Sequence, residues 1–164
     1  MTIKHISLLG LLLFTIVLGS CKKDDDPQSV EQVITPGVGI TDLKIGDTGQ
    51  KAIDLYGTVD PSYGSSGGQY THFLTYFTKG VLVYFEQTTE ATFNAQMKIA
   101  SLSFSAPFSG KTDKQIGIGS TKTAVKAAYG EPIYSSMFFG DAYVGITFIY
   151  DGDTGEKVET IEVE

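Results

Sequence analysis

Hydrophobic and polar positions divide the chain into three parts. Residues 6–19 form a predominantly apolar run of 14 residues, which is shorter than the roughly 20 that a membrane-spanning helix needs. Residues 22–36 are polar and show no hydrophobic period. From residue 37 onwards, short segments with helical spacing are followed by segments in which apolar and polar residues alternate. This last part is predicted to hold the folded protein.

The pattern of the third part occurs twice. Residues 44–57 (KIGDTGQKAIDLYG) align with residues 117–130 (GIGSTKTAVKAAYG) at a constant offset of 73, and both copies read Ile-Gly-x-Thr and end in Tyr-Gly. Further downstream, KGVLVYFE matches VGITFIYD, and KIASLSF matches KVETIEV. The chain therefore contains an internal duplication.

The repeated Gly-rich stretch predicts a helix start rather than a phosphate-binding loop. A P-loop needs a second glycine at the position that Lys122 occupies. Thr48 and Thr121 instead suit the N-cap of a short helix. Gly57 and Gly130 suit the left-handed position after its last turn.

Strands follow each predicted helix. A first strand is expected at residues 70–77, with its counterpart near residues 134–139, and residues 60–69, 88–96 and 152–156 are expected to be loops. The fold predicted is α+β, with two tandem α-β-β-β repeats and an antiparallel sheet that has the helices packed on one face. The side chains expected to point towards the helices are Val81, Val83, Phe85, Leu102, Phe104, Ile146, Phe148, Tyr150, Ile161 and Val163.

The N-terminus predicts a lipid anchor. The sequence Leu-Gly-Ser-Cys ending at Cys21 resembles the lipobox of bacterial lipoproteins, in which the chain is cut before the cysteine and the cysteine is acylated. The following KKDDD resembles the surface-export signal of Bacteroidetes-type lipoproteins, although such charge also makes a solvated spacer. The predicted organisation is a signal peptide at 1–20, a flexible acidic tether at 21–36, a first repeat at 37–111 and a second repeat at 112–164, with 37–164 forming one compact unit.

The tandem Gly-x-Thr units, each followed by antiparallel strands, resemble the beta-lactamase inhibitor protein family. They also resemble the small outer-membrane assembly lipoproteins of the BamE (SmpA/OmlA) type, which carry a single such unit. The chain departs from the inhibitors in having no disulfide cysteines, and it matches none of their contact residues. The resemblance therefore implies the fold and, by analogy with the inhibitors, a partner on the concave sheet, but not inhibitory activity.

Composition argues against several classes of function. Without residues 1–20, eleven lysines stand against nineteen acids, giving a net charge of −8, and the chain has no arginine. Nucleic acid is therefore not expected as a partner. The mature chain has one histidine, His72, which is interpreted as a surface strand residue, and no metal site or cofactor is predicted.

Two acidic candidates are interpreted as structural. Asp47 and Asp54 flank the first helix, but their counterparts in the second repeat are Ser120 and Ala127, so a catalytic carboxylate pair has no support. Residues 151–156 (DGDTGE) are read as a hairpin turn rather than a calcium loop. The protein is not expected to be an enzyme.

The face of the sheet away from the helices is the predicted contact surface. It combines polar strand positions with Leu82, Tyr84 and Ile149. A loop such as residues 60–69, or a second subunit, is the alternative cover for these side chains. Tyr84 is the favoured contact, because it offers a large apolar body and a hydroxyl.

These features predict a lipid-anchored binding or interaction module of the cell envelope. Its expected partners are the membrane, through the anchor, and another envelope or secreted protein. The expected location is the outer membrane, at the cell surface or alternatively on the periplasmic face. An outer-membrane assembly or scaffold lipoprotein is the alternative function, and an enzyme of unknown class is the third.

Overall fold

The computed structural model describes residues 31–138, 140–152 and 154–164, so Cys21 lies outside the described residues. Its main feature is one eight-stranded sheet in the order β2-β3-β4-β5-β10-β9-β8-β7, in which every neighbouring pair is antiparallel. The strands are β2 (Ser62–Ser66), β3 (Gln69–Tyr76), β4 (Val81–Phe85), β5 (Ile99–Ser105), β7 (Tyr134–Ser136), β8 (Gly140–Tyr143), β9 (Ile146–Tyr150) and β10 (Val158–Val163). The two repeats meet where β5 pairs with β10.

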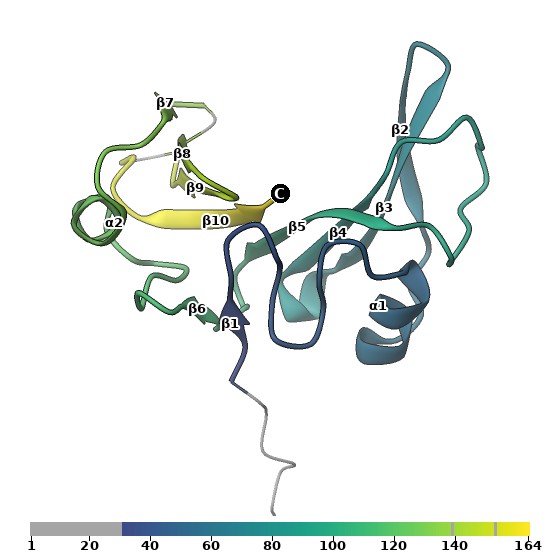
Figure 1. Ribbon diagram of the computed structural model, residues 1–164, viewed down its shortest axis with the longest axis horizontal. Helices are drawn as coiled ribbons and strands as arrows, with labels where there is room; N and C mark the ends of the chain where they lie inside the picture. Colours follow the sequence, from purple (N-terminus) through teal and green to yellow (C-terminus); the bar gives the residue numbers. More distant parts are fainter. Residues whose placement is uncertain (1–30, 139, 153) are drawn as a thin grey trace, which may run out of the picture.

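The remaining elements are short. They are α1 (Gly49–Tyr56), α2 (Lys122–Tyr129), the 3-10 turn η1 (Phe77–Lys79), and a parallel pair formed by β1 (Val33–Ile34) and β6 (Lys111–Thr112). The sheet is strongly curved: its outer hairpins rise on one side, while α1 and the β1–β6 pair lie towards the other (Figure 1).

The predicted α+β class with helices packed on one face is wrong. Strand makes up 42% of the structure and helix 14%, so the protein is predominantly an antiparallel β protein. Each helix has only eight residues, and the fully buried apolar side chains are Ala52 in α1 and Val125 in α2. The N-terminal segment supplies Ile34, Ile40 and Leu43 to the core, each at most 2% exposed.

The number of strands per repeat is also corrected from three to four. Residues 62–66, expected to belong to a loop, form β2 and extend the edge of the sheet instead of covering its face. The strand expected near residues 134–139 contributes β7, the counterpart of β2, whereas the counterpart of β3 is β8. The predicted tether likewise ends too late, because Val33 and Ile34 already pair with β6.

The predicted inner face of the strands is confirmed. The ten side chains expected there are between 0 and 9% exposed. Burying such apolar surface is the main stabilising contribution to a fold of this kind.

The Gly-rich stretches are structural in both repeats. Gly119 N–H donates to Val158 O at 2.8 Å, and its equivalent Gly46 donates to Ile99 O at 2.8 Å. Gly117 N–H donates to the Ser120 hydroxyl, and Ser120 N–H to Gly117 O. These N–H groups are therefore already used, and none of them is left to hold a phosphate.

Helix capping differs between the copies. The Thr121 hydroxyl accepts from Ala124 N–H at 3.1 Å, as predicted for an N-cap. Thr48 also stands at the N-cap position with an extended backbone, as predicted, but its side chain makes no capping hydrogen bond. Gly57 and Gly130 follow the helices with φ of 94° and 81°, a region that favours glycine.

Candidate binding face of the sheet

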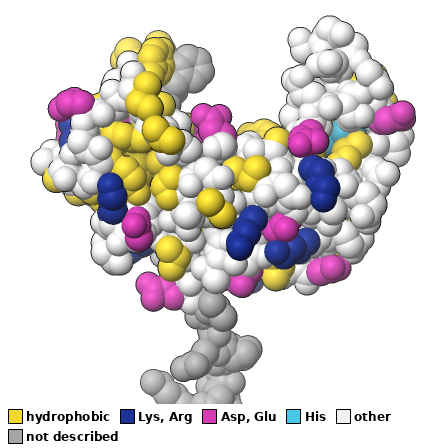
Figure 2. Space-filling view, in the orientation of Figure 1, with side chains coloured by type: hydrophobic (Ala, Val, Ile, Leu, Met, Phe, Trp, Pro, Cys, Tyr) yellow, Lys and Arg dark blue, Asp and Glu magenta, His cyan; other side chains and the backbone are white. Residues whose placement is uncertain are grey.

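The outer face of the sheet is the side turned away from the buried core. The register places one continuous row across it from β3 to β7: Thr75, Leu82, Ser103, Glu162, Thr147, Ala142 and Tyr134. The space-filling view shows the molecule hollowed between two lobes, above the middle of the sheet (Figure 2). This row therefore runs along the floor of a concave surface.

The structure brings together two of the three predicted contact residues. Leu82 and Tyr84 lie on the outer face of β4, both half-buried, and the Tyr84 ring packs on Phe73 of β3 with 5.9 Å between the ring centroids. Ile149 shares the face but lies on β9, three strand spacings away, which is about 14 Å. The intervening strands β5 and β10 present the polar residues Ser103 and Glu162 on this face, so the apolar positions do not form one cluster.

Glu162 occupies the centre of the face. It lies on β10, between Ser103 of β5 and Thr147 of β9. Burial raises the pKa of its carboxyl above the usual value, and the neighbouring charge of Glu164 raises it further. The pKa of Tyr84 is raised by burial and by the charge of Glu162, so the two side chains act on each other.

A groove of about 340 Å³ lies beside this pair. Its lining includes Tyr84, Ser101, Ser103 and three carboxylates, and none of its lining residues is basic. The lining carboxylates are Glu86, Glu162 and Glu164. The floor of the concave surface is thus acidic as well as partly apolar.

The two lobes differ in chemistry. Ile133, Tyr134, Met137 and Phe138 on and beside the β7–β8 hairpin are between 56 and 89% exposed, and hydrophobic side chains gather on this lobe in Figure 2. The tip of the other lobe, the β2–β3 turn, reads Ser-Ser-Gly-Gly. Exposed apolar side chains grouped at a rim are typical of a contact surface.

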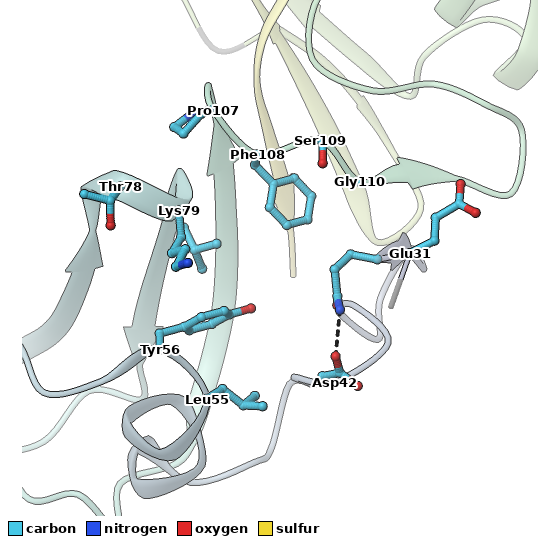
Figure 3. Close-up of a pocket in the computed structure, with 12 residues that line it drawn as sticks. Glu31, Asp42, Leu55, Tyr56, Thr78, Lys79, Pro107, Phe108, Ser109 and Gly110 are labelled. Carbon is cyan, nitrogen blue, oxygen red and sulfur yellow. Dashed lines mark hydrogen bonds between the residues drawn. The ribbon is translucent and has the colours of Figure 1, made fainter. Parts of the chain in front are cut away.

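A second, larger cavity of about 750 Å³ lies beside α1, under the N-terminal segment. Figure 3 shows Tyr56, Lys79 and Phe108 around it, with Asp42 on its far side accepting a hydrogen bond at 2.6 Å from Gln32. Burial, the charge of Asp42 and Tyr76 raise the pKa of Tyr56 to about 12, so its hydroxyl stays protonated at neutral pH. The lining includes one lysine and two carboxylates but no histidine.

The histidine prediction is wrong. His72 is 1% exposed on the inner face of β3, where Phe93 covers its ring, and its Nε2 donates to Glu90 O at 2.9 Å. The ring therefore tethers the β4–β5 connection and is closed to a substrate.

The acidic candidates have structural partners. Asp47 accepts from Lys44 N–H and from Lys51 Nζ, each at 2.8 Å. Asp54 accepts from Gln50 at 2.8 Å. Asp151 accepts from Thr154, Gly155 and Lys157 N–H groups, as the hairpin-turn interpretation requires. The described residues contain no group of three or more His, Cys, Asp or Glu that is arranged to hold a metal.

Sequence reasoning missed a buried polar cluster in the second repeat. Asp141 is 0% exposed and accepts from the Tyr150 hydroxyl at 2.9 Å and from the Ser135 hydroxyl. Lys122 Nζ lies 3.7 Å from Asp141 and 4.6 Å from the centre of the Tyr150 ring. A correct alignment of β8 with β3 would have revealed it, because Asp141 then replaces Leu74.

Comparison with known proteins gave no match to a family model, a curated protein or a solved structure. The resemblance to the inhibitors and the assembly lipoproteins therefore stays a prediction from the sequence. Within the described part of the chain, no helix has the length and apolar character needed to cross a membrane.

Proposed function

We propose that this protein is a lipid-anchored binding module of the bacterial cell envelope, which holds another envelope or secreted protein against the concave outer face of its sheet. The observation that carries the proposal is the composition of that face. Half-buried Leu82 and Tyr84 lie beside a half-buried glutamate, in a hollow that no element of the described chain covers. Aromatic and apolar side chains in a concavity are typical centres of a protein interface.

Site-specific crosslinking tests the face. A benzoylphenylalanine at position 84, in cells of the source organism, should give one defined crosslinked species. The same residue at position 55 is the matched control, because Leu55 is 42% exposed on α1, away from the outer face. In pull-downs of the partner identified in this way, Tyr84→Ser without a crosslinker should reduce capture about tenfold or more, with little change in Tm. Equal crosslinking from both positions, or a large loss of stability in Tyr84→Ser, would contradict the proposal.

The scaffold alternative is favoured by one observation, the exposed apolar rim on the β7–β8 hairpin. A crosslinker at Met137, which is 89% exposed, reports on that rim. An integral outer-membrane protein captured from position 137 but not from position 84 would support the scaffold function instead.

The anchor rests on the lipobox resemblance at Cys21. Cys21→Ala should release the protein into the soluble fraction or stall its processing, because several acyl chains are what hold such a protein stably at a membrane. Fractionation combined with mass measurement checks this. Membrane-bound mutant protein of unchanged mass would contradict the lipoprotein assignment.

A further inference from the structure

Within the part of the chain that the structure describes, the carboxylate of Glu162 has no ion-pair partner. Among the described residues, the ion pairs are Lys51–Asp47, Lys122–Asp141 and Lys126–Glu131, and none involves Glu162. The one charge that perturbs it is Glu164, which is also negative. In these surroundings, the ionised form of a half-buried carboxylate is destabilised, and a bound cation would stabilise it.

Two hydroxyl groups lie beside Glu162. Ser103 and Thr147 stand directly opposite Glu162 on the two neighbouring strands, at a Cβ separation of about 5 Å. Each residue is 8% exposed and has no side-chain hydrogen bond within the described residues, but neither hydroxyl is among the fully enclosed atoms that lack a partner, so solvent reaches both. Three acceptors, one charged and two neutral, thus stand in a line on the floor of the hollow.

The walls around these acceptors are apolar on one side. Leu82 is the next residue of the same row, and Tyr84 and Phe73 continue the apolar wall in the adjacent row. The site therefore suits a ligand group with an apolar stem and a small positive head. A lysine side chain has both, since its ammonium carries three N–H donors on a four-carbon stem.

We propose that the concave face carries, at Glu162, Ser103 and Thr147, a subsite for a primary ammonium group, namely a lysine side chain of the bound protein partner. The ammonium donates to the Glu162 carboxylate and to the two hydroxyls, while its stem lies against Leu82 and Tyr84. This inference rests on the proposed function and specifies the partner's chemistry. It also gives the three acidic residues of the groove a common role, which is to attract a basic protrusion.

Capped tripeptides test the subsite on the full mature chain. The probe is acetyl-Leu-Lys-Leu-amide, and binding is followed by the NMR shifts of Ser103, Thr147 and Glu162. The norleucine peptide keeps the stem and removes the charge, and it should bind at least tenfold more weakly. The trimethyllysine peptide keeps the charge and removes the donors, and it should also bind more weakly. Equal binding of the lysine and trimethyllysine peptides would overturn the proposal, because it would show attraction to the acidic surface alone.

Two variants of the protein test whether the lysine peptide binds at Glu162. Glu162→Gln should weaken the lysine peptide at least tenfold. Glu156→Gln is the matched control, since it removes the same charge from an exposed position in the β9–β10 turn, and it should leave binding unchanged. Equal losses in both variants would overturn the subsite.

The pH dependence has a defined sign. The titratable groups that face Glu162 are Tyr84 on β4, Glu86 directly after β4, and Glu164 directly after β10, while β5 and β9 present hydroxyls. Because the folded-state pKa of Glu162 is raised, its ionisation costs stability above that pKa, and this cost disappears as the pH falls. Glu162→Gln should therefore raise Tm at neutral pH but not in acid. Peptide affinity should fall as the pH falls through the Glu162 pKa. A lowered Tm at neutral pH would mean that Glu162 is a structural residue and would overturn the proposal.

Failure of this inference is distinguishable from failure of the proposed function. If position 84 crosslinks a partner but the lysine peptide does not bind, the ammonium subsite is wrong and the binding face stands. If the peptide binds at Glu162 but position 84 captures nothing, the subsite stands and the protein-binding function is wrong.

Discussion

At the scale of single residues, equivalent core positions of the two repeats are filled by side chains of different chemistry. Leu74, Phe85 and Gly49 in the first repeat correspond to Asp141, Tyr150 and Lys122 in the second, because β3 and β8 pair with their neighbours in the same register. The first set is apolar. In the second set, the buried Asp141 carboxylate receives two hydroxyl donors and a nearby ammonium group. A buried charge is tolerated only when it is compensated in this way.

The three polar positions are therefore expected to be coupled. Asp141→Leu alone should lower the free energy of unfolding by about 3 kcal/mol, because it leaves the Tyr150 hydroxyl without its acceptor and Lys122 without its counter-charge. The triple variant Lys122→Met, Asp141→Leu, Tyr150→Phe should come within about 1 kcal/mol of the wild type. Denaturant unfolding measures both. A triple variant as unstable as the sum of the single changes would show that the positions act independently.

At the scale of elements, the repeats differ most in the connection between their last two strands. The β4–β5 connection brings Phe93 onto Phe85, with 5.1 Å between ring centroids, and onto His72. The β9–β10 connection is shorter, and Lys122 extends over the Tyr150 ring instead. At Gly49 in the first repeat, a Cβ would lie 3.0 Å from both Phe85 and Phe93, so a side chain there requires these rings to shift. An inserted aromatic ring and a lysine thus cover equivalent positions.

Because an aromatic ring in one repeat and a lysine in the other cover equivalent positions, substitutions at Gly49 and Phe93 are expected to be energetically coupled. Phe93→Ala should cost about 3 kcal/mol of stability, since it opens a cavity over Phe85 and His72. Gly49→Lys should also destabilise the wild-type protein, by about 1 to 3 kcal/mol, because the new side chain collides with Phe93. In the Phe93→Ala background, the same lysine should cost less or restore stability. A double-mutant cycle in denaturant measures the difference, and strictly additive losses would contradict it.

The elements also show which parts of the fold could be predicted from the sequence. The short helices and the inner faces of β4, β5, β9 and β10 were predictable, because alternation and helix caps are local signals repeated twice. β2 was missed because Ser-Tyr-Gly-Ser-Ser has little strand propensity and becomes a strand through its pairing with β3. The α+β class was wrong because the N-terminal segment fills much of the core that the helices were expected to fill. The hydrophobic pattern of the sequence does not show this.

The candidate site was partly predictable for the same reason. Alternation along β4 placed Leu82 and Tyr84 on the outer face, and the structure has them there. The alternation could not predict the distance from Leu82 and Tyr84 to Ile149, and it could not place Glu162 between Ser103 and Thr147. Both depend on which strands of the two repeats become neighbours, and that pairing is fixed by contacts far apart in the sequence.

At the scale of the whole molecule, the two repeats are joined in more than one place. The β5–β10 pairing makes one sheet of both, and it places the inner-face residues of the two strands side by side, Phe104 opposite Ile161. The N-terminal segment adds a second link, since Gly37 N–H donates to Gly145 O at 2.7 Å and β1 pairs with β6. The concave face exists because both halves contribute to it.

The last prediction is that neither half folds alone. A fragment of residues 37–111 would expose the edge of β5 and the side chains of Leu102 and Phe104 that face β10 and the shared core. It would also lose Ile34, and a chain of this length buries only about 60% of its unfolded surface. Calorimetry of the fragment should show no sharp transition, while residues 31–164 should melt as one cooperative unit. Mixing the fragment with residues 112–164 should restore part of the transition, because the β5–β10 pairing can then form. A sharp melt of the first fragment by itself would show two independent domains, and the concave face would then be a surface between domains instead of the floor of one sheet.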